Sequence, residues 1–104
     1  MGIVVLITAK NIREANTIAA KLLEGRLIAC ANIIKGVHSI FTWKGKIDKA
    51  NETLLICKSK KSCFAGIVKT VKKHHSYEVP EIIALPIIDG NKDYMNWIKK
   101  NCLV

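Results

Sequence analysis

The chain has 104 residues, a mass of 11.6 kDa, an apolar content of 50% and a formal net charge of +9. This size and apolar content exclude disorder and indicate one domain, spanning residues 1–104. The longest purely aliphatic stretch, Ile3 to Ile7, is far too short to cross a bilayer and carries no features of an export signal. We therefore expect a cytoplasmic protein without a membrane partner.

The positive charge comes almost entirely from lysine, because Arg13 and Arg26 are the only arginines among 17 basic residues. Lys is a strongly hydrated point charge that is less suited than Arg to bidentate recognition of phosphate. The lysines are spread along the chain, and no aromatic stacking motif lies between them. We interpret them as solvated faces and expect no specific nucleic-acid partner, with a lysine-coated nucleic-acid module as an alternative.

The first half of the chain predicts a strand, a helix and a long strand. Ile3 to Thr8 is β-branched and apolar, as expected of a strand covered on both faces. Asn11 can cap a helix that Gly25 ends, with apolar residues at helical spacing between them. Residues Ala29 to Trp43 are rich in β-forming side chains, and Gly36 within them indicates a bulge or kink.

The second half predicts two strands and two helices. After a turn at Gly45, Glu52 to Ser59 is a third strand, and Ser62 can cap a helix that ends near His74. Glu81 to Ile87 is a fourth strand, in which Pro86 implies an edge or a strand end. Turn chemistry then precedes a short last helix, marked by Tyr94, Trp97 and Ile98.

This order predicts an α+β fold, the ferredoxin-like βαββαβ arrangement, with a short C-terminal helix. Two helices cover one face of such a sheet, but strands one, three and four are apolar on both faces. A monomer would expose an apolar patch larger than soluble monomers usually tolerate. We therefore expect the chain to associate with copies of itself.

The four cysteines form no Cys-x-x-Cys pair, which favours reduced thiols over a disulfide framework. Cys30 has alanine on both sides, which leaves room beside its thiol. Spacing alone does not distinguish a reactive Cys30 from a buried cysteine that packs as a small hydrophobe. Cys57 and Cys63 lack metal-ligand spacing, and Cys102 lies near the end of the chain.

The run from His75 to Ile83 sets an imidazole, a phenol and two carboxylates in extended backbone between a basic helix and an apolar strand. His75 and Glu78 could bind copper or zinc. Equally, His75 could be favoured by a helix dipole and Glu78 by a nearby lysine. The sequence has no phosphate-binding loop, nucleophile elbow or acid-base pair at fixed spacing, so we expect no enzyme and no organic cofactor.

Several segments, in this order and spacing, resemble the divalent-cation-tolerance (CutA) family over almost the whole chain. They are Ile28-Ala29-Cys30-Ala31-Asn32-Ile33, Phe41-Thr42-Trp43-Lys44-Gly45, Glu52 to Ser59, His75 to Ile83, and Pro86 to Gly90 followed by Tyr94 and Trp97. The resemblance implies a ferredoxin-like subunit of a homotrimer, similar in build to PII-type signalling proteins. It further implies tolerance of copper and other divalent metals.

The resemblance also assigns residues. Cys30, His75 and Glu78 fall on positions similar to the family's proposed metal cluster, and Trp43, Lys58 and Tyr77 line the nearby cleft between subunits. The implied metal is copper, with zinc the nearest competitor. The alternative is a PII-like sensor that binds a small anion in that cleft through Lys58 and its neighbours. This chain departs from the family in its strong positive charge and in having Cys57 and Cys63.

Overall fold

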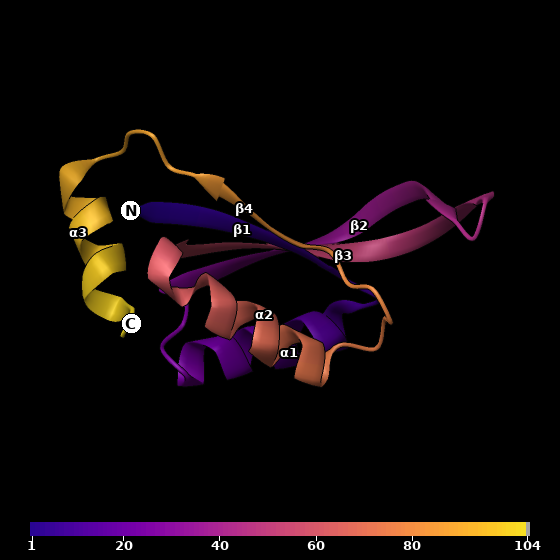
Figure 1. Cartoon of the computed structure of the whole chain (residues 1–104), viewed down its shortest axis with the longest axis horizontal. Coiled ribbons are helices and arrows are strands. Elements are labelled where there is room, and N and C mark those ends of the chain that lie inside the picture. Colours follow the sequence, from indigo (N-terminus) through magenta and orange to yellow (C-terminus); the bar gives the residue numbers. More distant parts are fainter. Residues whose placement is uncertain (104) are drawn as a thin grey trace.

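The computed structural model describes residues 1–103 and contains one antiparallel sheet with three α-helices (Figure 1). The sheet order β2-β3-β1-β4 and the element order confirm the ferredoxin-like βαββαβ prediction and the added C-terminal helix. Within the described residues, no helix is long and apolar enough to span a membrane. The elements are β1 (Gly2–Ala9), α1 (Ile12–Glu24), β2 (Cys30–Trp43), β3 (Lys46–Lys60), a 3₁₀ turn (Lys61–Cys63), α2 (Phe64–His74), β4 (Ile82–Pro86) and α3 (Lys92–Asn101).

The core lies between the sheet and the helices α1 and α2, which share one of its faces, while α3 closes one end (Figure 1). Side chains alternate along β1, so that Ile3, Val5 and Ile7 are buried against the helices. The α1 helix begins at the Asn11 cap, whose side chain accepts a hydrogen bond from the Glu14 backbone N–H. Its apolar stripe completes the core with Ala15, Ile18, Ala19 and Leu22.

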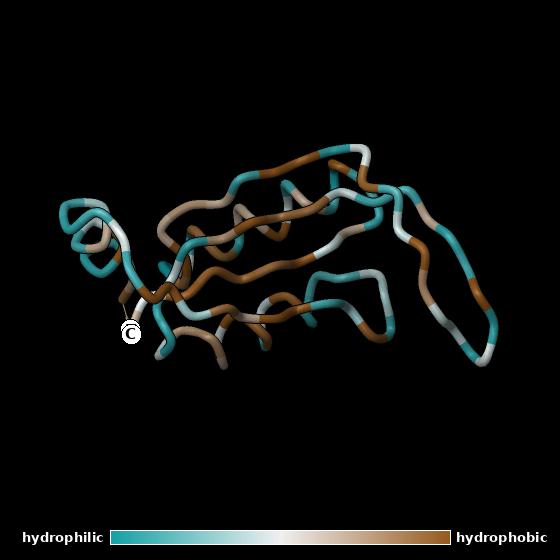
Figure 2. The backbone as a smooth tube through the Cα atoms, turned by 90° about the horizontal axis from the view of Figure 1, so that it is seen from above, coloured by the Kyte–Doolittle hydropathy of each residue, from teal (hydrophilic) through white to brown (hydrophobic). Residues whose placement is uncertain are grey.

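The opposite face of the sheet carries no helix within the described residues (Figure 1), and Figure 2 shows hydrophobic residues along the strands that form it. On this open face, Leu6 lies between Ile56 of β3 and Ile83 of β4. This face offers apolar surface to solvent, because its residues Ile34, Ile83 and Leu85 are 46%, 47% and 48% exposed. The chain alone therefore leaves the second apolar face in water, as the sequence predicts.

The strands β2 and β3 form a hairpin that continues beyond the rest of the sheet as a long two-stranded arm (Figure 1). The predicted irregularity at Gly36 is confirmed, because the register shifts between Ile34 and Val37 and Gly36 has φ of +76°. The prediction that the third strand begins at Glu52 was wrong, since β3 begins at Lys46. Residues 46–51 are mostly polar because both faces of the arm are exposed, so they lack the apolar pattern of a core strand.

The α2 helix begins at Phe64 after the 3₁₀ turn, one residue later than a cap at Ser62 predicts. Cys63 occupies the N-cap position without a side-chain hydrogen bond to the helix. The last helix, α3, is capped by Asn91, whose side chain accepts from the backbone N–H groups of Asp93 and Tyr94. Ile98 and Cys102 anchor this end of the chain in the core.

The packing of α1 yields a stability test on neighbouring leucines. Leu22 is fully buried, so Leu22→Ala leaves a cavity and should lower the free energy of unfolding by about 2–5 kcal/mol. Leu23 is 44% exposed, and Leu23→Ala should change it by only about 0.5 kcal/mol. Urea unfolding measures both. Equal losses would contradict the orientation of α1 on the sheet.

Candidate functional site

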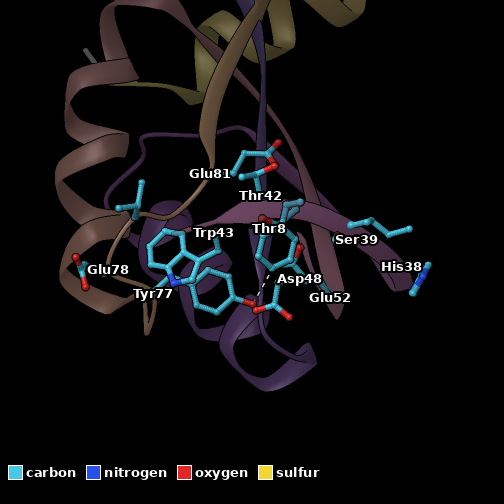
Figure 3. Close-up of a pocket in the computed structure, with 13 residues that line it drawn as sticks. Thr8, His38, Ser39, Thr42, Trp43, Asp48, Glu52, Tyr77, Glu78 and Glu81 are labelled. Carbon is cyan, nitrogen blue, oxygen red and sulfur yellow. Dashed lines mark hydrogen bonds between the residues drawn. The ribbon is translucent and has the colours of Figure 1, made fainter. Parts of the chain in front are cut away.

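A cleft of about 820 Å³ lies between the β2–β3 arm and the segment that leads from α2 to β4 (Figure 3). The arm contributes both of its strands, and the segment from Tyr77 to Glu81 forms the other wall. Trp43 and Tyr77 supply aromatic surface. Figure 3 shows His38 and Glu78 at opposite margins of the view, with Asp48 and Glu52 between them.

The lining of this cleft is acidic although the chain as a whole is strongly basic. Four of the eight acidic residues line it: Asp48, Glu52, Glu78 and Glu81. Within the described part of the chain, no Lys or Arg is among its lining residues. A cleft lined by charge of one sign focuses the field and concentrates ions of the opposite sign. The cleft therefore favours a cation.

Tyr77 and Glu52 are joined at the floor of this site. The Tyr77 hydroxyl donates a hydrogen bond of 2.8 Å to Glu52 Oε2, and Glu52 is only 8% exposed. Burial, together with the hydrogen bond and negative charge of Glu52, raises the pKa of Tyr77 to about 12. The phenol is thus held neutral and serves as a donor to a carboxylate.

His75 holds the junction loop to the end of β1. Its side chain is fully buried, its Nε2 lies 2.7 Å from the Thr8 carbonyl oxygen, and its Nδ1 accepts from the Tyr77 backbone N–H at 3.0 Å. This network assigns the proton to Nε2, which donates to Thr8. The two rings of His75 and Tyr77 lie 4.8 Å apart between centroids. Both ring nitrogens are therefore already hydrogen-bonded within the chain.

Glu14 of α1 also holds this junction loop, through a hydrogen bond to its backbone. Its Oε2 accepts from the Ser76 backbone N–H at 3.0 Å, and its Oε1 lies 3.7 Å from His75 Nδ1. Burial raises the pKa of the Glu14 carboxyl, but hydrogen bonds from Ser76 and Lys10 outweigh it and leave that pKa lowered. The carboxylate thus stays charged and fixes the loop that carries Tyr77 and Glu78.

Cys30 and Lys58 lie elsewhere, at the α3 end of the open face. They are direct partners in the β2–β3 register. Cys30 Sγ lies 3.8 Å from the Tyr94 hydroxyl and 4.0 Å from Asn32 Oδ1, and the Lys58 ammonium donates to the same Asn32 oxygen. Lys58 pairs with Val4 of β1, whereas His75 contacts Thr8 of the same strand. The two groups are therefore separated by four residues along β1.

Within one chain, then, the residues singled out in the sequence form two groups. Trp43, Tyr77 and Glu78 line the cleft, and His75 lies directly behind Tyr77. Cys30 and Lys58 belong to the second group. Residues 1–103 contain no cluster of three or more His, Cys, Asp or Glu side chains arranged to hold a metal ion. The sequence analysis did not identify Asp48 and Glu52 as site residues. For Glu52, the available signal was its position directly before the apolar run of β3.

Comparisons with known proteins agree on one family. The family model for the CutA1 divalent ion tolerance protein matches residues 3–101. The divalent-cation tolerance protein CutA of Thermus thermophilus is 45% identical over 98 residues, which are 94% of this chain and 95% of that protein. A rice relative, Protein CutA 1, chloroplastic, is 39% identical over 96% of this chain and 56% of its own length.

Solved structures give the same result. The divalent cation tolerance protein Cut A1 from Thermus thermophilus superposes with a TM-score of 0.96 at 44% identity, covering 98% of this chain and 99% of that one. The periplasmic divalent cation tolerance protein CutA from Archaeoglobus fulgidus gives a TM-score of 0.94 at 42% identity, covering 97% of this chain and 98% of that one.

The Tyr77 hydroxyl provides a spectroscopic test of the cleft. In a Tyr94→Phe background, Tyr77 should ionise near pH 12, and Glu52→Gln should lower that value because it removes a negative charge. Since the folded pKa exceeds the ordinary value of about 10, this contribution to stability is complete below pH ~10 and is lost as pH rises through 12. Ultraviolet titration of tyrosinate measures the ionisation. An unchanged value in Glu52→Gln would contradict the contact.

Proposed function

This chain belongs to the CutA1 divalent ion tolerance family, and from that membership we propose that it is a cytoplasmic homotrimer that binds copper in the response to metal ions. It acts by binding and not by converting a substrate. The observation that carries the proposal is the acidic cleft, because its carboxylates select positive ions in a chain whose overall charge repels them. The alternative, a PII-like sensor of a small anion, would use a cleft between subunits that includes Lys58, a residue that does not line this acidic cleft.

Copper is proposed because of the types of ligand that three candidate residues offer. Cys30, His75 and Glu78 together offer a thiolate, an imidazole and a carboxylate, and soft sulfur with borderline nitrogen favours copper over hard cations, with zinc as the nearest competitor. Glu78 lines the cleft, whereas Cys30 lies at the far end of the open face. These ligands can converge only when copies of the chain assemble.

His75 constrains how such a site would form. Its Nε2 is bonded to the Thr8 carbonyl and its Nδ1 to the Tyr77 N–H, so a metal ion must displace one of these partners. Displacement at Nδ1 would free the backbone N–H of Tyr77 and shift the loop that carries Glu78. Copper binding through His75 should therefore be accompanied by a change at the cleft wall.

The homotrimer is proposed to bury the open face. Val4, Leu6 and Ile56 share that face with the more exposed Ile83 and Leu85, and no helix within residues 1–103 covers them. A cyclic assembly of identical chains covers such a face without leaving an unpaired edge. Obligate interfaces of this type commonly exceed about 2,000 Å².

Light scattering tests the assembly. At micromolar concentration the protein should have about three times its chain mass of 11.6 kDa. Leu85→Lys places a charge on the open face and should shift the mass toward that of a single chain, whereas Ile88→Lys, at a residue 95% exposed and outside β4, should leave the trimer intact. A stable wild-type monomer with a cooperative melt would refute the trimer.

A Cu(II) competition titration tests the metal site. Cys30→Ala, His75→Ala and Glu78→Gln should each weaken Cu(II) binding by about 10-fold or more, because each removes a proposed ligand. Cys57→Ala is the matched control, since that thiol is fully buried in the core and should not contribute. Mg²⁺ and Ca²⁺ should compete poorly.

Other outcomes of the same titration assign the ion elsewhere. If Asp48→Asn and Glu81→Gln abolish Cu(II) binding while the three ligand variants retain it, the carboxylates of the cleft hold the ion without the cluster. If every variant binds as wild type, copper binding at this site is wrong.

A further inference from the structure

The acidic cleft combines aromatic rings with carboxylates, and a site for a bare metal ion needs no rings. On the arm, Phe41 is the direct partner of Asp48 in the β2–β3 register. Successive side chains along a strand alternate between its faces, so Trp43 and Glu52 share the face of that pair. All four residues line the cleft, and Tyr77 adds a third ring from the segment that follows α2 (Figure 3). Ring faces and carboxylates therefore lie together in one cavity.

Glu52 is a buried carboxylate without a cation beside it. It is 8% exposed, and within residues 1–103 it forms no ion pair. Tyr77 donates a hydrogen bond to Oε2 of Glu52, but a neutral phenol does not compensate a negative charge. Burial of a charged group costs much free energy unless that group is paired. A cation that enters the cleft would supply the missing charge.

Trp43 shows which kind of cation suits the aromatic part of the cleft. The Lys44 ammonium lies 5.9 Å from the centroid of the Trp43 ring, within the range of a cation–π contact. Trp43 lines the cleft, whereas Lys44 does not. The chain itself therefore holds an alkylammonium group at the margin of the cleft.

The carboxylates of the cleft are too dispersed to converge on one ion. Asp48 and Glu52 come from β3, whereas Glu78 and Glu81 come from the segment that forms the other wall. Within residues 1–103, no three such side chains are placed to hold a metal ion together. A volume of about 820 Å³ is also that of a small-molecule pocket. The ligand that matches this cleft is long and carries several separate positive charges.

We propose that the acidic cleft binds a linear aliphatic polyamine. Its ammonium groups donate charge-assisted hydrogen bonds to carboxylates on both walls, and one of them lies beside Glu52. The methylene segments between the charges pack on the rings of Trp43 and Tyr77. A quaternary ammonium ion fits less well, because it has no N–H to donate and one charge for four carboxylates. This inference goes beyond copper binding and requires neither the copper cluster nor the trimer.

Isothermal titration calorimetry with spermidine as the probe tests the proposal. The parent is the Cys30→Ala variant in a buffer with EDTA, so that failure of the copper cluster does not affect the result. The parent should bind spermidine more tightly than putrescine, which has one ammonium group fewer, and choline most weakly. Binding should weaken as salt is added, because salt screens the attraction between partly exposed charges.

Variants in the same background locate the ligand. Trp43→Leu should weaken spermidine binding by about 5-fold, because it removes a cation–π contact. Glu52→Gln and Glu81→Gln should each weaken it by about 10-fold, because each removes a charged acceptor. Trp97→Leu and Glu24→Gln are the matched controls and should bind as the parent does, since both side chains are exposed and neither lines the cleft.

Circular dichroism and light scattering check that each variant keeps the fold and the mass of the parent. Glu81 is exposed, so its variant still tests the cleft if Glu52→Gln does not fold. The proposal is overturned if the parent binds no spermidine, if the Trp43 and Trp97 variants weaken binding equally, or if choline binds as tightly as spermidine. Full displacement of spermidine by an equal concentration of Mg²⁺ would also overturn it, because the cleft would then select charge alone.

Discussion

The rest of the structure depends on how the sheet is covered. The sheet has two apolar faces, and the helices α1 and α2 cover only one of them. Burial of apolar side chains is the main favourable term in folding, so the face with Val5, Ile7 and Leu55 defines the core. The face with Leu6, Ile83 and Leu85 is left without a helix over it. Both groups of candidate site residues border the open face, so their positions depend on one face of the sheet having no helix over it.

The acidic cleft depends in turn on two extensions beyond the core. The arm of β2 and β3 continues past the ends of β1 and β4, and the junction loop after α2 lies against its base. The side chains of His75 and Glu14 accept hydrogen bonds from the backbone of that loop, which carries Tyr77 and Glu78. Such a loop can hold side chains in place without an ordered ligand.

The fold was predictable because its signals are local, whereas the sites depend on which strands become neighbours. Asn11, Gly36 and Gly45 each mark a boundary through their own backbone chemistry, and the structure places a cap, a bulge and a turn there. By contrast, residues 46–51 carry no apolar alternation, so the sequence predicts the β2 strand of the arm but not the first part of β3. Glu52 accepts a hydrogen bond from Tyr77 across 25 positions, and no spacing rule in a sequence predicts such a pair.

The order in which the strands are made has a consequence for synthesis. The strand β1 is central in the sheet and is synthesised before both of its neighbours, which are residues 46–60 and 82–86. Its aliphatic run from Ile3 to Ile7 therefore has no complete pairing until most of the chain has been translated. Long-range pairing of this kind slows folding and lengthens the time for which an unpaired, aggregation-prone strand is exposed. The high lysine content gives the nascent chain a charge that opposes its clustering with other copies before β1 is enclosed.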